Sequence, residues 1–199
     1  MPLLQTPTLN SLEAYAKRLQ VDRANTYLVS YPEFLAYFQN LATIKRHHVV
    51  IGAYFTYGWM PKILTLGKRN LNQAAEQLNL IKSGNSIGID GLQLMKEIVN
   101  NSTVGLSKLL HFVNPNLYAI WDSHVAHYLL GKPCPQNWIG DLTLYMDYLQ
   151  LCQGIVHLPD YKGIHDVVTD KVGYSMSSLR TLELLMFRSS QETNKAIRA

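Results

Sequence analysis

The residues best suited to chemistry lie in one short stretch, residues 117–129 with the sequence LYAIWDSHVAHYL. Asp122 directly follows Trp121, and Ser123 and His124 come next, at the start of an apolar segment. Aspartate is among the preferred N-cap residues, and its charge suits the positive end of a helix, effects worth about 1 kcal/mol together. The same carboxylate, held in place by the helix, could stabilise positive charge that develops on a substrate. Asp122 is therefore either a helix cap alone or both a cap and a catalytic group.

A second chemical candidate precedes this stretch in the segment VGLSKLL, which contains Ser107 and Lys108. A desolvated lysine near other cations has a lowered pKa, and its amine can attack a sugar carbon to form a Schiff base. The alternatives for Lys108 are an exposed helix residue or a contact to a phosphate. Ser107 could bond either a phosphate or the preceding turn.

The order of these segments resembles that of the helix-hairpin-helix DNA glycosylase superfamily. In that family a glycine-rich hairpin grips a DNA phosphate, a lysine can follow it, and an aspartate lies in a Val-Asp-Thr-His-Val segment. The residues IWDSHV at 120–125 match this segment, with serine for threonine and tryptophan for valine. Of the two hairpin glycines, the stretch NNSTVGLSK keeps only Gly105. The stretches YGWMPKIL and SKLLHFVNPNLYAIWDS are similar to those of compact bacterial members.

The resemblance implies a cluster-free DNA glycosylase that flips a modified base out of double-stranded DNA. Asp122 would be its catalytic carboxylate, and hydrolysis of the N-glycosidic bond would leave an abasic site. If the Lys108 amine attacks instead of water, strand nicking follows. The preferred substrate is a hypermodified phage cytosine, such as glucosylated hydroxymethylcytosine, in an anti-phage defence role. The alternatives are repair of oxidised or alkylated bases, and an inactive DNA- or protein-binding module on the same scaffold.

The remaining site residues are expected around this centre. Ser123 and His124 are expected to support the helix start, His124 by bonding a backbone carbonyl. No metal or cofactor is expected. Aromatic residues are expected to line the base pocket, although each of them could instead fill the core: Tyr54, Tyr57, Trp59 and Trp121. Residues expected to bind DNA are Gly105, Ser107, Lys45, Arg46 and Lys62, beside His47, His48, Lys68 and Arg69.

Composition limits the class of protein. Of 199 residues, 47% are hydrophobic and 16% charged, which predicts a folded chain with a substantial core. The net charge of +4 agrees with a polyanionic partner without requiring one. The two cysteines are too few for a structural zinc or iron–sulfur site. Without a visible signal peptide or an 18-residue apolar run, we expect a cytoplasmic monomer that does not bind membranes.

The apolar spacing predicts a mainly α, multi-helix fold, with a degenerate helix-hairpin-helix and a cleft between helical lobes. We expect a single globular unit over 1–199, with a glycosylase-like core over 49–130. Ser11 is expected to cap the first helix, and Pro32 to lie in the first turn of the second. The segment 157–170 is expected to be a polar loop. The other helices are expected over 46–57, 62–66, 70–83, 91–101, 104–113, 122–130, 142–156 and 175–190.

Overall fold

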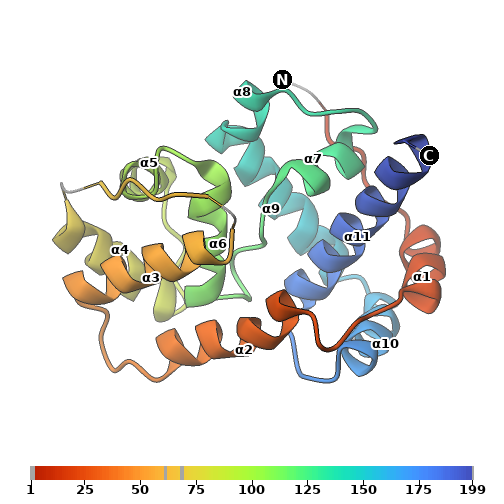
Figure 1. Ribbon diagram of the computed structural model, residues 1–199, viewed down its shortest axis with the longest axis horizontal. Coiled ribbons are helices and arrows are strands. Elements are labelled where there is room, and N and C mark those ends of the chain that lie inside the picture. The colour runs from red at the N-terminus through yellow and green to blue at the C-terminus, as the bar shows by residue number, and fades with distance from the viewer. Residues whose placement is uncertain (1–2, 61, 68–69, 199) are drawn as a thin grey trace. The chain divides into compact units, whose positions relative to one another are not determined.

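The structure is a computed structural model that describes residues 3–60, 62–67 and 70–198, with side chains as far as residue 193. This described part contains 11 helices and no strand (Figure 1). An isolated antiparallel bridge joins Leu66 to Val99. The prediction of a mainly α fold is therefore confirmed, and its glycosylase-like detail stays a prediction.

The chain divides into two compact units. Unit 2 is the continuous segment Ala24–Tyr118, and unit 1 combines Met1–Arg23 with Ala119–Ala199. The predicted core over 49–130 extends across the boundary between Tyr118 and Ala119, so it draws residues from both units.

Unit 2 is organised around its last helix. That helix, α6, contacts each of the other four, and most of its side chains are buried, among them Leu106, Leu109 and Phe112. Helix α3 also packs on α4, and α4 on α5. The helices of unit 2 are α2 (Thr26–Gln39), α3 (Arg46–Gly58), α4 (Leu71–Lys82), α5 (Ile89–Ile98) and α6 (Thr103–Val113) (Figure 1).

Unit 1 is organised around the C-terminal helix. Helix α11 contacts α7, α9, α10 and α1, and buries Leu182, Leu185 and Met186. Arg180 and Glu183 form an ion pair one turn apart on this helix, with both side chains buried. The helices of unit 1 are α1 (Leu9–Arg18), α7 (Ser123–Leu130), α8 (Gln136–Ile139), α9 (Leu142–Val156), α10 (Tyr161–Val172) and α11 (Ser178–Arg198).

Two predicted helix starts are wrong. Thr8, not Ser11, caps α1, because the Thr8 hydroxyl accepts the Ser11 N–H at 3.2 Å. Helix α2 begins at Thr26, where the Asn25 side chain accepts the Tyr27 N–H. Pro32 lies inside this helix rather than in its first turn, at the expense of one backbone hydrogen bond.

Two segment assignments are also wrong. The segment 157–170 is not a loop, because most of it belongs to α10, which buries Tyr161, Ile164, Val168 and Val172 at helical spacing. Residues 62–66, expected to be helical, form no helix. Other helix ends are confirmed: Gly84 follows the end of α4 and Gly131 caps α7, each with the positive φ that favours glycine.

Candidate active site around Asp122

Asp122 is the N-cap of α7. Its Oδ1 accepts the backbone N–H groups of His124 at 2.9 Å and Val125 at 3.0 Å. Among the described residues no hydrogen bond reaches Oδ2, and the side chain is half-buried. The predicted cap is therefore confirmed, and one oxygen of the carboxylate remains available to a ligand.

The segment leading into Asp122 is clamped inside unit 1. Trp121 is fully buried, and its indole N–H donates to the Ile139 carbonyl at 3.1 Å. Two hydroxyls from α9 hold the carbonyls just before it: Tyr145 donates to Ala119 at 3.2 Å and Tyr148 to Ile120 at 2.8 Å. Trp121 is therefore a core residue, and its prediction as a base-pocket residue is wrong.

The two residues after Asp122 support the helix start differently from expectation. Ser123 is exposed. His124 contributes its backbone N–H to the cap, and its ring packs edge-on against Phe187 of α11, with centroids 5.0 Å apart. Among the described residues the His124 ring bonds no backbone carbonyl. In the same part of the chain, no group of three or more histidine, cysteine, aspartate or glutamate side chains is placed to hold a metal ion.

In unit 2, asparagines form the turn that the resemblance assigns to the hairpin. Asn100 and Asn101, between α5 and α6, have φ values of 57° and 50°. This left-handed conformation is the one that glycine adopts most easily and asparagine tolerates. The Asn100 amide accepts the Thr65 N–H at 2.7 Å and donates to the Ile63 carbonyl at 3.0 Å. Asn100 and Asn101 therefore take the left-handed positions of this turn, and no glycine is needed there.

Gly105 and Ser107 do not face outward. Gly105 is buried, and a Cβ there would lie 2.8 Å from the Tyr57 hydroxyl oxygen. The Gly105 N–H donates to the hydroxyl of Ser102, the N-cap of α6, at 3.1 Å. Ser107 is fully buried and donates to the Val104 carbonyl at 2.9 Å. Of the two alternatives for Ser107, the structure shows the bond to the preceding turn. The prediction that Gly105 contacts DNA is wrong for this structure.

Tyr57 is likewise a packing residue. It is 3% exposed, and its hydroxyl donates to the Val99 carbonyl at 2.9 Å. Burial raises the pKa of this phenol, so the hydroxyl remains a donor. Tyr57 holds the end of α3 against the turn that precedes α6, and its prediction as a base-pocket residue is wrong.

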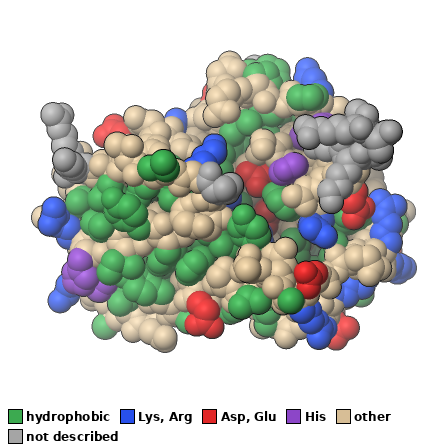
Figure 2. All heavy atoms as spheres, in the orientation of Figure 1, with side chains coloured by type: hydrophobic (Ala, Val, Ile, Leu, Met, Phe, Trp, Pro, Cys, Tyr) green, Lys and Arg blue, Asp and Glu red, His purple; other side chains and the backbone are tan. Residues whose placement is uncertain are grey.

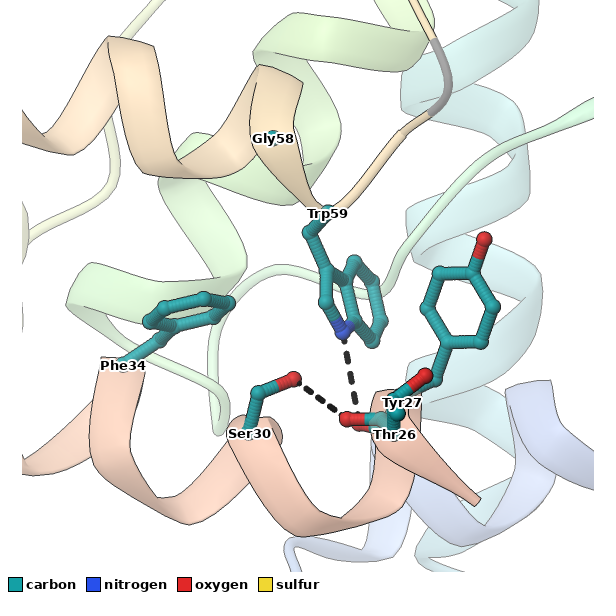
Figure 3. Close-up of a pocket in the computed structure, with 6 residues that line it drawn as sticks. All are labelled: Thr26, Tyr27, Ser30, Phe34, Gly58 and Trp59. Atoms are coloured by element: carbon teal, nitrogen blue, oxygen red, sulfur yellow. Dashed lines mark hydrogen bonds between the residues drawn. The ribbon is translucent and has the colours of Figure 1, made fainter.

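Trp59 lines an open hollow of about 290 Å³ in unit 2 (Figure 3). Its indole N–H donates to the Tyr27 carbonyl at 3.3 Å, and Phe34 and Ser30 project into the same space from α2. The Lys108 ammonium lies over the Trp59 ring, 5.3 Å from its centroid. The full lining is Thr26, Tyr27, Ser30, Phe34, Gly58 and Trp59. Thr26, Tyr27 and Ser30 were not predicted as site residues, because they precede the predicted start of the second helix.

The outer surface of α3 carries aromatic and basic side chains. Tyr54 is 55% exposed on this helix, and Figure 2 shows hydrophobic side chains across it. Lys45 and Arg46 are exposed at its start, and Lys62 is exposed beyond its end. These three cations are therefore accessible to solvent, and their contact with DNA stays a prediction. Lys68 and Arg69 lie outside the described residues.

The start of α3 also contains a neutral-histidine contact. His48 Nδ1 accepts the Lys45 N–H at 3.0 Å, so this nitrogen must be unprotonated. Burial lowers the pKa of His48, and the charges of His47 and Lys45 lower it further.

No known protein family, curated protein or solved structure matches this chain. Among its described residues, no helix combines the length and the apolar character that a membrane crossing needs.

Proposed function

We propose that this protein is a DNA glycosylase in which the Asp122 carboxylate is the catalytic group. The observation that carries the proposal is the different bonding of the two oxygens of this carboxylate. Oδ1 is fixed by two backbone amides of α7, whereas no described residue bonds Oδ2. A carboxylate fixed in this way needs no reorganisation when charge develops on a substrate.

The proposed reaction is hydrolysis of an N-glycosidic bond. As the bond from C1′ to the base nitrogen breaks, the bonding electrons leave with the base and positive charge builds on the sugar. Asp122 stabilises that charge and orients or deprotonates the attacking water. The water oxygen bonds to C1′, and the departing base takes up a proton. The products are the free base and an abasic site.

Lys108 stays the second catalytic candidate. Attack of its amine on C1′ would give a Schiff base and allow strand nicking. Its ammonium lies over the Trp59 ring, 5.3 Å from the centroid, and the face of the ring attracts a cation. This contact supports a non-covalent role, such as phosphate binding, over a nucleophilic one.

The surface of unit 2 supports a DNA partner. Aromatic side chains stack on bases of any sequence, and the hollow beside Trp59 presents Tyr27 and Phe34 as well. Exposed Lys45, Arg46 and Lys62 supply cations for backbone phosphates. Our preferred substrate is a hypermodified phage cytosine, excised as a defence activity, with oxidised or alkylated host bases next.

A second candidate function is a DNA- or protein-binding module without catalysis. Burial of Gly105 and Ser107 favours it, because both were expected to form the phosphate grip of a working hairpin. The Asp-Ser-His-Val segment at residues 122–125 favours the enzyme, because the resemblance implies a catalytic carboxylate at this position.

The test is release of bases from a panel of duplexes and phage genomes that carry different modified bases. Abasic sites are detected by alkaline strand cleavage, and borohydride trapping detects a Schiff base. The proposal expects abasic sites on at least one substrate. Trapped complex that disappears in Lys108→Gln would assign the nucleophile. Tight DNA binding without any abasic site would favour the binding module.

A further inference from the structure

Tyr148 lies on α9 beneath the segment that leads into Asp122. It is fully buried, and its hydroxyl donates to the Ile120 carbonyl at 2.8 Å. Tyr145, on the same face of α9, donates to the Ala119 carbonyl at 3.2 Å. Residues 119–122 belong to no helix or strand, so their buried backbone groups need partners from side chains. The two tyrosine hydroxyls satisfy two consecutive carbonyls.

The Tyr148 ring also contacts the next residue. Its centroid lies 4.9 Å from that of Trp121, whose indole is itself held by the Ile139 carbonyl. Tyr148 therefore fixes the chain at residue 120 through its hydroxyl and at residue 121 through its ring. Asp122 comes next, between this clamp and the first turn of α7.

The Tyr148 hydroxyl is a permanent donor. Burial keeps the pKa of this phenol well above its ordinary value, and the nearby Cys152 thiol and Glu183 carboxylate act in the same direction. The hydroxyl therefore stays protonated, and able to donate to the Ile120 carbonyl, at the pH where an ordinary tyrosine ionises.

We propose that Tyr148 is a positioning residue, which holds the Asp122 carboxylate at the start of α7 through the main chain of residues 120 and 121. Its effect on turnover depends on the proposed glycosylase function, whereas its effect on the cap does not. Displacement of a catalytic group by about 1 Å can cost on the order of 100-fold in rate. Loss of the clamp should therefore slow chemistry without weakening DNA binding, since Tyr148 is buried.

The test compares Tyr148→Phe with Tyr161→Phe. Tyr161 is 1% exposed in the same unit, and its hydroxyl donates to the Ser178 carbonyl at 3.0 Å, away from residues 119–122. Each variant removes one buried hydroxyl and keeps the ring. The first readout is amide hydrogen exchange at His124 and Val125, whose N–H groups bond Asp122 Oδ1. We expect exchange about tenfold faster in Tyr148→Phe and unchanged in Tyr161→Phe.

The second readout is the single-turnover rate of base release at saturating DNA. We expect a loss between about 10- and 100-fold in Tyr148→Phe, with an unchanged Kd for DNA, and no loss in Tyr161→Phe. Equal effects of both variants, or unchanged exchange at His124 and Val125 in Tyr148→Phe, would overturn the positioning role. If the wild type releases no base, the glycosylase proposal fails, and the exchange experiment still decides the role of Tyr148. If Tyr148→Phe does not fold, the same comparison is made with Tyr145→Phe, which removes the longer of the two bonds to residues 119 and 120.

Discussion

At the scale of single residues, Asp122 shows how a structural and a chemical role can share one side chain. The cap uses Oδ1, and asparagine carries an equivalent oxygen that can accept the same two N–H groups. Replacement by asparagine therefore removes the charge and keeps the geometry, whereas alanine removes both.

This difference predicts the stability of two variants. We expect Asp122→Ala to lower the free energy of unfolding by about 1 kcal/mol, because α7 loses its cap. Asp122→Asn should lie within about 0.5 kcal/mol of wild type, because asparagine caps nearly as well. Denaturant unfolding measures both values. An asparagine variant as unstable as the alanine variant would show that the carboxylate charge itself holds the helix start.

Gly105 gives a second residue-scale prediction. A Cβ at this position would lie 2.9 Å from the Tyr57 ring, so Tyr57 must shift in Gly105→Ala. We expect this substitution to lower the free energy of unfolding by about 1–3 kcal/mol. Gly154, exposed on α9, is the matched control, since nothing lies within 4 Å of its added Cβ. We expect Gly154→Ala to raise the stability by about 0.5–1 kcal/mol. Thermal unfolding of the two variants checks the pair, and a neutral Gly105→Ala would contradict the packing role.

At the scale of elements, the start of α3 is expected to respond to pH. The pKa of His48 is lowered in the folded protein, so the unfolded chain binds more protons as the pH falls below the ordinary histidine value of about 6.5. Its stabilising effect is therefore complete above that value and is lost on acidification toward the folded-state pKa. Protonation also removes the acceptor for the Lys45 N–H.

The corresponding variant is His48→Gln. Glutamine at this third helical position can accept the same N–H in a capping box at any pH. We expect its melting temperature to fall less than that of wild type between pH 7.5 and pH 5.5. The melting temperature of His48→Gln should still depend on pH to some extent, because burial also lowers the pKa of His165 in α10. His157→Gln, at an exposed position, serves as the control. If that variant reduced the pH dependence of the melting temperature equally, the dependence could not be assigned to His48.

The elements also show what the sequence could and could not predict. The helix at 142–156 was predictable, because its apolar residues recur at helical spacing. The Val-Val-Ile run in 46–57 also suits a strand, and the helix was predicted there from its helical neighbours. The start of α2 was missed because Pro32 was taken as a first-turn residue, although the chain tolerates it inside the helix. Helix α10 was missed because its polar composition outweighed the periodic spacing of Tyr161, Ile164 and Val168.

The site was predictable only where local rules decide it. Asp122 as a cap follows from residue type and position. The burial of Tyr57, Trp121 and Ser107 does not, because it depends on partners elsewhere in the fold, such as Val99 and Ile139. An aromatic residue that fills a core and one that lines a pocket have the same local sequence signature.

At the scale of the whole molecule, the net charge of +4 and the exposed cations predict a salt-dependent affinity for DNA. Each phosphate contact contributes about 0.9 to the slope of log affinity against log salt. We expect the double variant Lys45→Gln, Arg46→Gln to reduce the slope by about 2. The control replaces Lys17 and Lys162, which pair with Glu13 and Asp166. A DNA affinity that does not change with salt concentration would contradict the proposal of a DNA partner.

The central claim concerns Asp122, and the most direct measurement is abasic-site formation by wild type and Asp122→Asn on the same modified duplex. DNA affinity and unfolding free energy are measured for both proteins in parallel. The glycosylase account predicts release by wild type, and a loss of at least about 1000-fold in the variant with binding and stability retained. Equal release by the two proteins would contradict it, because the Asp122 charge would then have no part in the reaction and the residue would be a helix cap alone.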